Sequence, residues 1–176
     1  MEKRHILIVG ERQVGKSTLI RRLLDHTDRP VCGFMTKILP ADKTGFHPIY
    51  IHPAAQAVED RVYTPENLIG TCDTKIHNVN QAAFDTFGVE YLTDLLKDGI
   101  AVMDELGFME VCSEAFTSKV LEVLDGDIPV LAAVKTRTDI DFLNAVRAHP
   151  KAQVFTITED NRGELFDTLL PILQSL

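Results

Sequence analysis

Residues 5–20 read HILIVGERQVGKSTLI, and they combine three local patterns in direct succession. The opening HILIV is a short apolar run, which is typical of a strand buried on both faces of a parallel sheet. The run ends at Gly10. Apolar residues then recur with helical spacing, at Leu19, Ile20, Leu23 and Leu24, which predicts a helix over 16–24. The segment therefore predicts a strand, a glycine-bounded loop and a helix.

The loop between that strand and that helix matches the pattern G-x-x-x-x-G-K-[ST] in full. It consists of Gly10, Glu11, Arg12, Gln13, Val14, Gly15, Lys16 and Ser17, and Thr18 follows it. The glycines allow successive backbone N–H groups to point at phosphate oxygens, and the helix start adds the positive end of its dipole. Lys16 would reach the β- and γ-phosphates, and Ser17 would bind Mg²⁺. We therefore predict that residues 10–18 bind a nucleoside triphosphate and that Lys16 is also catalytic.

A second apolar run, IAVM at 100–103, leads directly into Asp104 and Glu105. Ligands of α/β proteins bind at the carboxyl ends of the strands, so Asp104 is expected beside the phosphate loop, holding Mg²⁺ through water. Glu105 would orient or deprotonate the attacking water. The alternative interpretation is that both are solvated acids at a strand end.

Residues 104–107 read DELG, which also satisfies the D-x-x-G pattern of regulatory GTPases. Such proteins normally carry N/T-K-x-D after a later strand, where the aspartate recognises guanine. Residues 134–139 read VKTRTD here and do not match that pattern. Strong selectivity for guanine is therefore not expected.

The rest of the chain alternates strand and helix patterns. Further strands are expected at 31–39, 47–52, 129–134 and 153–157, and further helices at 80–96, 113–124, 139–148 and 162–173. The first two of these strands flank a turn-rich segment and predict an antiparallel hairpin, whereas 53–74 is polar and irregular. The alternation predicts an α/β fold with a mostly parallel central sheet flanked by helices and a hairpin insertion.

Length and composition indicate the broad class of protein to which the chain belongs. The chain has 176 residues, which predicts a single domain over 1–176, and its formal net charge is −8. That charge gives no field to attract nucleic acid or anionic lipid, so neither is expected as a partner. The three cysteines are far apart and are expected as small buried side chains of a reducing compartment. Because no signal peptide or stretch of about 18 apolar residues is present, we expect a cytoplasmic protein without a membrane partner.

Taken together, these segments resemble the THEP-type (cancer-related) nucleoside-triphosphatases over nearly the whole chain. Besides the phosphate loop, the resemblance covers CGFMT at 32–36, GF at 45–46, HNVN at 77–80, DELGFME at 104–110 and VFTITEDNR at 154–162. It implies a RecA-like P-loop NTPase fold and a slow, Mg²⁺-dependent hydrolysis with broad base tolerance. It also implies that Arg162 approaches the nucleobase or a phosphate.

Two positions depart from the family pattern. Phe108 stands where the family motif has lysine, and Lys43 stands where it has arginine before the glycine-phenylalanine turn. Lysine lacks the planar, bidentate fork of arginine, so a cation contributed by Lys43 would bind the γ-phosphate less well. Both changes affect the expected catalytic rate more than nucleotide binding.

Several weaker candidates have a structural alternative. Asn161 and Glu164 have the spacing of a capping box for the last helix. Glu110 could support the acidic motif or complement a helix dipole. Thr36 could sense the γ-phosphate or be an ordinary strand residue. No cluster of histidines has the spacing of a metal site.

Three functional hypotheses remain at this stage. The first is a nucleoside-triphosphatase acting on ATP, GTP or other triphosphates. The second is a nucleotide or small-molecule kinase, which is disfavoured because 53–74 contains only one arginine, Arg61, whereas closing lids usually carry several. The third is a nucleotide-switched binding module with the hairpin at 31–52 as its partner surface. The sequence identifies no protein partner.

Overall fold

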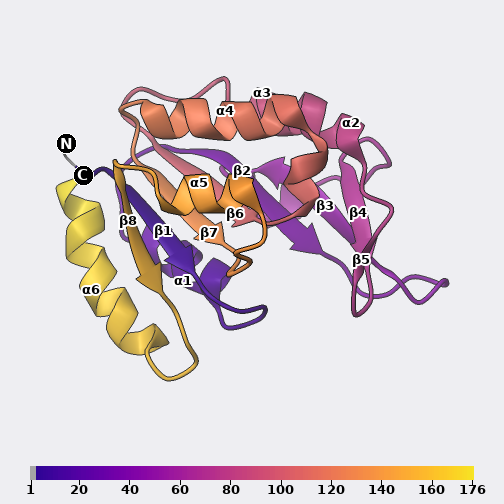
Figure 1. Cartoon of the computed structure of the whole chain (residues 1–176), viewed down its shortest axis with the longest axis horizontal. Coiled ribbons are helices and arrows are strands. Elements are labelled where there is room, and N and C mark those ends of the chain that lie inside the picture. The colour runs from indigo at the N-terminus through magenta and orange to yellow at the C-terminus, as the bar shows by residue number, and fades with distance from the viewer. Residues whose placement is uncertain (1–2) are drawn as a thin grey trace.

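A computed structural model describes residues 3–176, which form one eight-stranded sheet with helices on both faces (Figure 1). The strand order is β5-β4-β3-β2-β6-β7-β1-β8. The strands are β1 (His5–Val9), β2 (Val31–Ile38), β3 (His47–Pro53), β4 (Leu68–Cys72), β5 (Ile76–His77), β6 (Ile100–Leu106), β7 (Val130–Val134) and β8 (Ala152–Thr156). Strands β2, β6, β7, β1 and β8 are parallel, and β3, β4 and β5 extend the sheet in antiparallel fashion.

The helices divide between the two faces of the sheet. They are α1 (Lys16–Leu24), α2 (Gln81–Ala83), α3 (Val89–Tyr91), α4 (Glu114–Asp125), α5 (Asp141–Arg147) and α6 (Arg162–Ser175). Three short turns accompany them: η1 (Val58–Asp60) and η3 (Met109–Cys112) are 3-10 helices, and η2 (Phe84–Gly88) is a π-helix. Helices α1 and α6 cover one face, and α4 and α5 cover the other (Figure 1).

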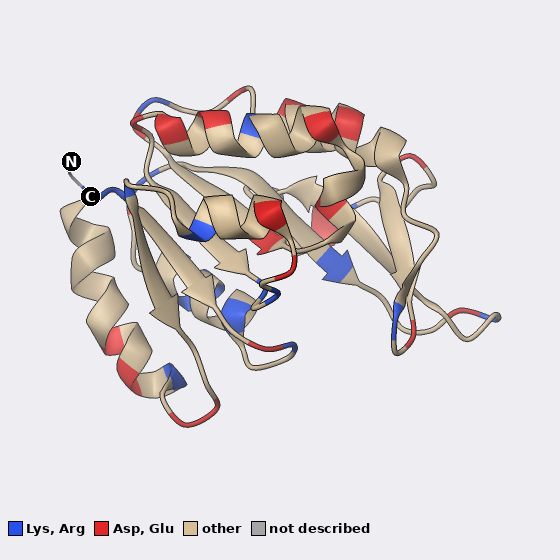
Figure 2. Ribbon diagram, in the orientation of Figure 1, with Lys and Arg blue, Asp and Glu red and all other residues tan. Residues whose placement is uncertain are grey.

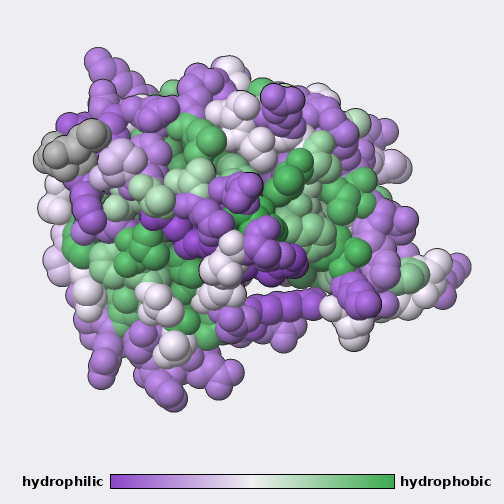
Figure 3. Space-filling model, viewed as in Figure 1, coloured by the Kyte–Doolittle hydropathy of each residue, from purple (hydrophilic) through white to green (hydrophobic). Residues whose placement is uncertain are grey.

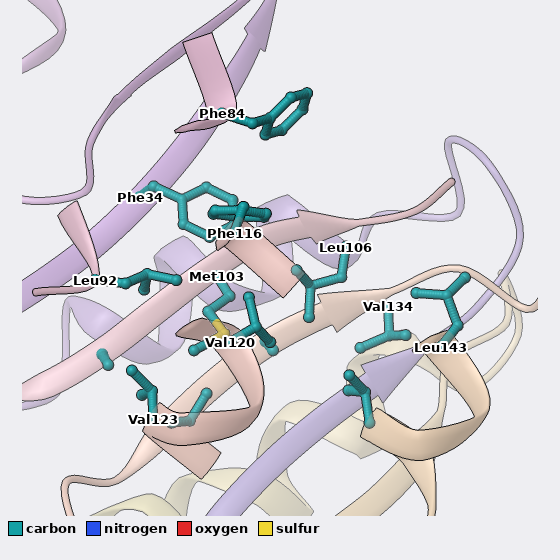
Figure 4. Close-up of a cluster of buried hydrophobic side chains, with 14 of the residues drawn as sticks. Phe34, Phe84, Leu92, Met103, Leu106, Phe116, Val120, Val123, Val134 and Leu143 are labelled. Atoms are coloured by element: carbon teal, nitrogen blue, oxygen red, sulfur yellow. The ribbon is translucent and has the colours of Figure 1, made fainter. Parts of the chain in front are cut away.

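The two faces have separate apolar cores because side chains alternate along each strand. In β1, Leu7 and Val9 join the core beneath α4 and α5, whereas Ile6 and Ile8 join the core beneath α1 and α6. The first core contains a chain of aromatic rings in which Phe116 of α4 lies 5.4 Å from Phe34 and 5.3 Å from Phe84, measured between ring centroids (Figure 4). Both faces of the central strands are therefore buried, as their continuous apolar runs predict.

The expected α/β architecture and the antiparallel hairpin of β2 and β3 are confirmed. The antiparallel part is larger than predicted, because the segment expected to be irregular contains β4, and β5 follows shortly after it. These strands are short and carry no strong alternation of their own. Their conformation depends on pairing with β3, which a reading of local patterns does not detect.

The helix predicted over 80–96 is shorter and interrupted. It ends at Tyr91, and a π-turn divides it into α2 and α3. At Gly88 the backbone lies directly on α4, since an added Cβ would come within 2.6 Å of the ring of Phe116. Leu96, which was expected on the helix, is exposed. The packing against α4, rather than the spacing of apolar residues, determines where this helix bends.

Two further sequence-based expectations concern single residues and the membrane. Cys32 and Cys72 are buried as expected, but Cys112 is exposed because it lies in the short turn η3 ahead of α4. Among residues 3–176, no helix combines the length and the apolar character needed to cross a bilayer.

The end of β6 carries the acidic pair, and a buried carboxyl group fixes the turn that follows. Strand β6 continues past its predicted end through Asp104 and Glu105 to Leu106. Glu110 of η3 is buried, and its Oε2 accepts a hydrogen bond of 2.9 Å from the backbone N–H of Gly107. Burial raises the pKa of Glu110 to about 7, although the backbone hydrogen bonds and the charge of Lys135 oppose the shift. Glu110 therefore holds the chain in a return turn directly after the acidic pair.

Gly33 sets the distance between β2 and β6 and gives a first prediction. Its φ is +88°, and an added Cβ would lie 2.1 Å from the carbonyl oxygen of Val102. We expect Gly33→Ala to lower the free energy of unfolding by about 2–4 kcal/mol, measured by urea denaturation. Gly163→Ala is the matched control, because nothing lies within 4 Å of that position, and its effect should stay below about 1 kcal/mol. Equal effects of the two substitutions would contradict this account.

The buried carboxyl group of Glu110 gives a second prediction, about pH. Its folded pKa of about 7 lies above the ordinary value of 4.5, so protonated Glu110 stabilises the fold at low pH, and this contribution is lost as the pH rises through 7. The natural protein should therefore lose up to about 3 kcal/mol of stability relative to Glu110→Gln between pH 5 and pH 8. Urea denaturation of both proteins at each pH measures this difference. A stability difference that does not change with pH would show that Glu110 does not titrate as described.

Candidate functional site

The loop at 10–17 connects β1 to α1 and has the backbone of an anion-binding nest. Gly15 precedes the helix in the left-handed region with φ 107°, and Gln13 also has a positive φ of 63°. No side chain caps the first turn of α1, so its N–H groups remain directed into the loop. Gly10 packs closely on the end of β8, where an added Cβ would lie 2.6 Å from a side-chain carbon of Ile157. The loop can therefore present backbone donors to phosphate oxygens.

Lys16 lies inside this loop rather than in solvent. Its side chain is 3% exposed, and Nζ donates hydrogen bonds to the carbonyl oxygens of Gly10 at 2.8 Å and Glu11 at 2.6 Å. The same ammonium group lies 3.1 Å from Oε2 of Glu105. Lys16 thus joins the phosphate loop to the end of β6.

Ser17 and Asp104 meet as the sequence predicts. The hydroxyl of Ser17 donates a hydrogen bond of 2.8 Å to Oδ1 of Asp104. Asp104 is buried, and its Oδ2 has no hydrogen-bond partner among the described residues. Burial raises the pKa of Asp104 to about 6, while the hydrogen bond from Ser17 acts in the opposite direction. A hydroxyl and a carboxylate with an unpartnered oxygen fit a hard divalent cation such as Mg²⁺, which would offset the cost of burying that charge.

Glu105 is half-buried between two ammonium groups. Its Oε2 faces Lys16, and its Oε1 lies 3.3 Å from Nζ of Lys135. Lys135 follows β7, the strand next to β6, so both residues lie at the carboxyl edge of the sheet. Sequence reasoning missed Lys135, because the segment at 134–139 was examined only for a guanine-recognition motif. The sequence did contain a signal for it, because Lys135 comes immediately after the apolar run that forms β7, at the edge of the sheet where ligands bind.

The remaining residues of the phosphate loop differ in where their side chains lie. Val14 is buried in the core beneath α1, and Glu11 accepts a hydrogen bond of 2.8 Å from the hydroxyl of Thr136. Nη2 of Arg12 lies 3.8 Å from Sγ of Cys72 in β4. Gln13 and Thr18 are exposed. Within this loop, contacts to phosphate are therefore available from the backbone and from Lys16 and Ser17.

The last helix brings Arg162 to the loop but does not use Asn161 as predicted. An added Cβ at Gly15 would lie 3.9 Å from Cδ of Arg162, which places this arginine beside the phosphate loop. The capping box expected from Asn161 and Glu164 is wrong. Oδ1 of Asn161 instead accepts a hydrogen bond of 2.8 Å from the backbone N–H of Thr158, and its Nδ2 donates to the carbonyl oxygen of Thr156. Asn161 therefore shapes the loop between β8 and α6.

The two departures from the family pattern occupy different places. Phe108 and Thr36 line the same cavity as Ser17 and Glu105. Lys43 is exposed in the turn between β2 and β3 and does not line that cavity. Figure 2 shows that basic residues gather around the carboxyl ends of the central strands, although the net charge of the chain is −8. Lys135, and not Lys43, therefore supplies the second cation beside Glu105, in addition to Lys16.

Comparison with known proteins gives a consistent result. A family profile described as NTPase matches residues 5–170. The "Nucleoside-triphosphatase THEP1" of Methanocaldococcus jannaschii is 31% identical over 94% of this chain and 94% of its own length. The "Cancer-related nucleoside-triphosphatase homolog" of Mus musculus is 26% identical over 98% of this chain and 97% of its own length.

A solved structure has the same fold. The crystal structure of THEP1 from Aquifex aeolicus superposes with a TM-score of 0.76 over 96% of this chain and 98% of that chain, at 21% identity. The family profile spans nearly all of the described residues, including the phosphate loop, the acidic pair and the start of α6. The chain therefore belongs to the NTPase family, the group of P-loop enzymes that includes the THEP-type and cancer-related nucleoside-triphosphatases.

Proposed function

We propose that this protein hydrolyses the β–γ bond of nucleoside triphosphates in a Mg²⁺-dependent reaction with broad base tolerance and slow turnover. The observation that carries the proposal is the convergence of two contacts at one edge of the sheet. Ser17 donates to Asp104 at 2.8 Å, and Lys16 lies 3.1 Å from Glu105. Each contact joins the phosphate loop to the acidic pair at the end of β6, which is the arrangement that phosphoryl transfer requires.

Substrate binding would use the loop and the metal ligands together. Backbone N–H groups of residues 10–17 and the start of α1 surround the β- and γ-phosphates. Ser17 and Asp104 would hold Mg²⁺, which supplies charge neutralisation of the phosphates when bound. The unpartnered Oδ2 of Asp104 supports this assignment. Arg162 lies beside the loop and would contact a phosphate or the base.

Lys16 would exchange partners when the triphosphate binds. Its ammonium group now faces two loop carbonyl oxygens and Glu105. Phosphate oxygens would replace some of these acceptors, and this exchange frees a carboxylate oxygen of Glu105 to accept a hydrogen bond from water. The need to break the partly buried ion pair between Lys16 and Glu105 in each cycle supports slow turnover.

Hydrolysis would proceed by in-line attack of a water held by Glu105. The water oxygen forms a bond to the γ-phosphorus, the bond from that phosphorus to the β–γ bridging oxygen breaks, and the nucleoside diphosphate leaves. Glu105 accepts the proton that the water loses. Lys135, which lies 3.3 Å from Glu105, is placed to stabilise negative charge on the γ-phosphate.

Broad base tolerance is supported by the segment where base recognition would be expected. Arg137 and Asp139 form an ion pair with each other, at 2.5 Å between Nη2 and Oδ2. The carboxylate of Asp139 is thus paired with Arg137 of the same loop and is not free to accept hydrogen bonds from a base. Arg162 is a flexible, exposed cation that can face any base.

The division of roles between Lys16 and Glu105 gives a third prediction. Glu105→Gln should lower kcat by about 10²–10³-fold while nucleotide still binds, because the amide keeps the shape but accepts no proton. Lys16→Ala should weaken binding of the triphosphate itself. Phosphate release from ATP, GTP, CTP and UTP, with Mg²⁺ or with EDTA, measures the activity. Release that persists in EDTA, or in Glu105→Gln, would contradict the proposed mechanism.

A fourth prediction concerns the cation beside Glu105. Lys135→Ala should lower kcat by about 10–100-fold, since one charge that faces the γ-phosphate is lost. Lys43→Ala removes the same charge from an exposed turn outside the cavity and should leave kcat unchanged. Steady-state phosphate release compares the two variants with the natural protein. Loss of activity in Lys43→Ala with full activity in Lys135→Ala would reverse the assignment.

A further inference from the structure

A large cavity opens beside Glu105, between the phosphate loop and the antiparallel part of the sheet. Its volume is about 720 Å³. At one end it is lined by Ser17, Glu105 and Lys135 of the site described above. Its lining also includes Ile38 at the end of β2 and residues of the antiparallel strands β3, β4 and β5, namely Ile49, Ile69, Cys72 and Ile76. The antiparallel extension of the sheet thus forms a chamber on the γ-phosphate side.

Hydrolysis does not account for a chamber of this size. The γ-phosphate and one water molecule need only the end that contains Ser17, Glu105 and Lys135. Cavities of about 300–1,000 Å³ are typical of sites that enclose a whole small molecule. The chamber therefore has room for a second ligand beside the nucleotide.

The wall of the chamber combines apolar side chains with the polar ones. Ile49, Ile69 and Cys72 are buried, and Ile38 at the rim is 47% exposed. Phe108 and Met109 contribute from the turn after β6. Figure 3 shows hydrophobic surface over the region where Figure 1 draws the outer strands, bordered by polar residues. Ile38, Ile76 and Phe108 keep part of their side-chain surface exposed, and an apolar molecule in the chamber would remove that surface from water.

The charges that line the chamber are mainly positive. Arg12, Lys37 and Lys75 line it, and within residues 3–176 none of the three forms an ion pair. The carboxylates on the lining are Glu105, which is held by two lysines, and Glu110, which binds the backbone of Gly107. In a chain of net charge −8, this local excess of positive charge favours an anion.

We propose that the chamber binds a second small molecule together with the nucleotide, and that this molecule is an organic anion with an apolar body. Its anionic group, a carboxylate or a phosphate, would pair with Lys37, Lys75 and Arg12. Its body would cover Ile38, Ile76 and Phe108. The inference rests on the proposed function only in placing the γ-phosphate near Ser17 and Glu105.

Arg12 connects this second site to the phosphate loop. It belongs to the loop, yet its Nη2 lies 3.8 Å from Sγ of Cys72 in β4. Its guanidinium group therefore forms part of the chamber wall and is not directed into the phosphate nest. The two ligands would thus occupy adjoining parts of one cavity.

Binding of 8-anilinonaphthalene-1-sulfonate, an aromatic anion, tests the proposal through its fluorescence. We expect saturable binding to one site, with displacement by octanoate or octyl phosphate. Octylammonium, which has the same chain and the opposite charge, should compete about tenfold less well. Comparison of octanoate with octyl phosphate identifies the preferred anionic group. Equal competition by octylammonium and the two anions would overturn the proposal, because it would indicate only a nonspecific apolar surface.

Charge reversal locates the site. The double substitution Lys37→Glu and Lys75→Glu should weaken binding of the dye by about tenfold or more. Lys97→Glu is the matched control, because Lys97 is exposed and lies outside the chamber, and it should change binding by less than about twofold. Nucleotide affinity and thermal unfolding, measured on the same variants, verify that they fold. Equal losses in the double variant and in Lys97→Glu would place the dye elsewhere and refute the site.

The dye experiment and the phosphate-release experiment test the two proposals separately, so either proposal can be contradicted without the other. A protein that binds the dye with the expected charge dependence but releases no phosphate contradicts the proposed hydrolysis and leaves the chamber assigned. A protein that hydrolyses triphosphates but does not bind the dye, octanoate or octyl phosphate contradicts the second site alone.

Discussion

The hydrogen bond between Ser17 and Asp104 joins residues that are 87 positions apart in the chain. The rest of the site depends on the alignment of strands that brings these two residues together. Ser17 comes after β1, and Asp104 lies near the end of β6. Strand β7 separates these two strands in the sheet. Parallel pairing aligns the carboxyl ends of these strands at one edge. Only with this alignment does a loop after one strand meet an acid at the end of another. The apolar cores on both faces stabilise the sheet and so maintain this alignment.

Buried charge is the second constraint. Asp104 is buried with one unpartnered oxygen, and Lys16 is buried among loop carbonyl oxygens and Glu105. Burial of unpaired charge is unfavourable, so these groups favour ligands of opposite charge, as the proposed triphosphate and Mg²⁺ would be. Lys135 and Glu110 complete the arrangement, since one faces Glu105 and the other fixes the turn that follows it.

The antiparallel strands give the molecule a feature that phosphate binding does not explain. Strands β3, β4 and β5 continue the sheet beyond β2, and their side chains line the cavity that also contains Ser17 and Glu105. Arg12 and Phe108 link this wall to the phosphate loop and to the acidic turn. In the proposed second site, strands added at one edge of a common P-loop framework would supply part of the binding surface, because function depends on sites more than on the fold.

The sequence by itself determined the central strands, the phosphate loop and the acidic pair, because each depends on a contiguous run of residues. An apolar run specifies a buried strand, and the spacing of glycines, lysine and serine specifies the loop. Only the tertiary structure decided the position of Lys135 beside Glu105, the placement of Arg12 against β4, the pairing of β4 and β5, and the role of Asn161 in its loop. The first three arise from contacts between segments that are not adjacent in sequence, so a local pattern does not contain them. The same reason explains the helix after residue 80, whose π-turn follows from the packing of Gly88 on Phe116. Asn161 forms local hydrogen bonds, but its sequence spacing fits a capping box equally well, and only the folded loop distinguishes the two.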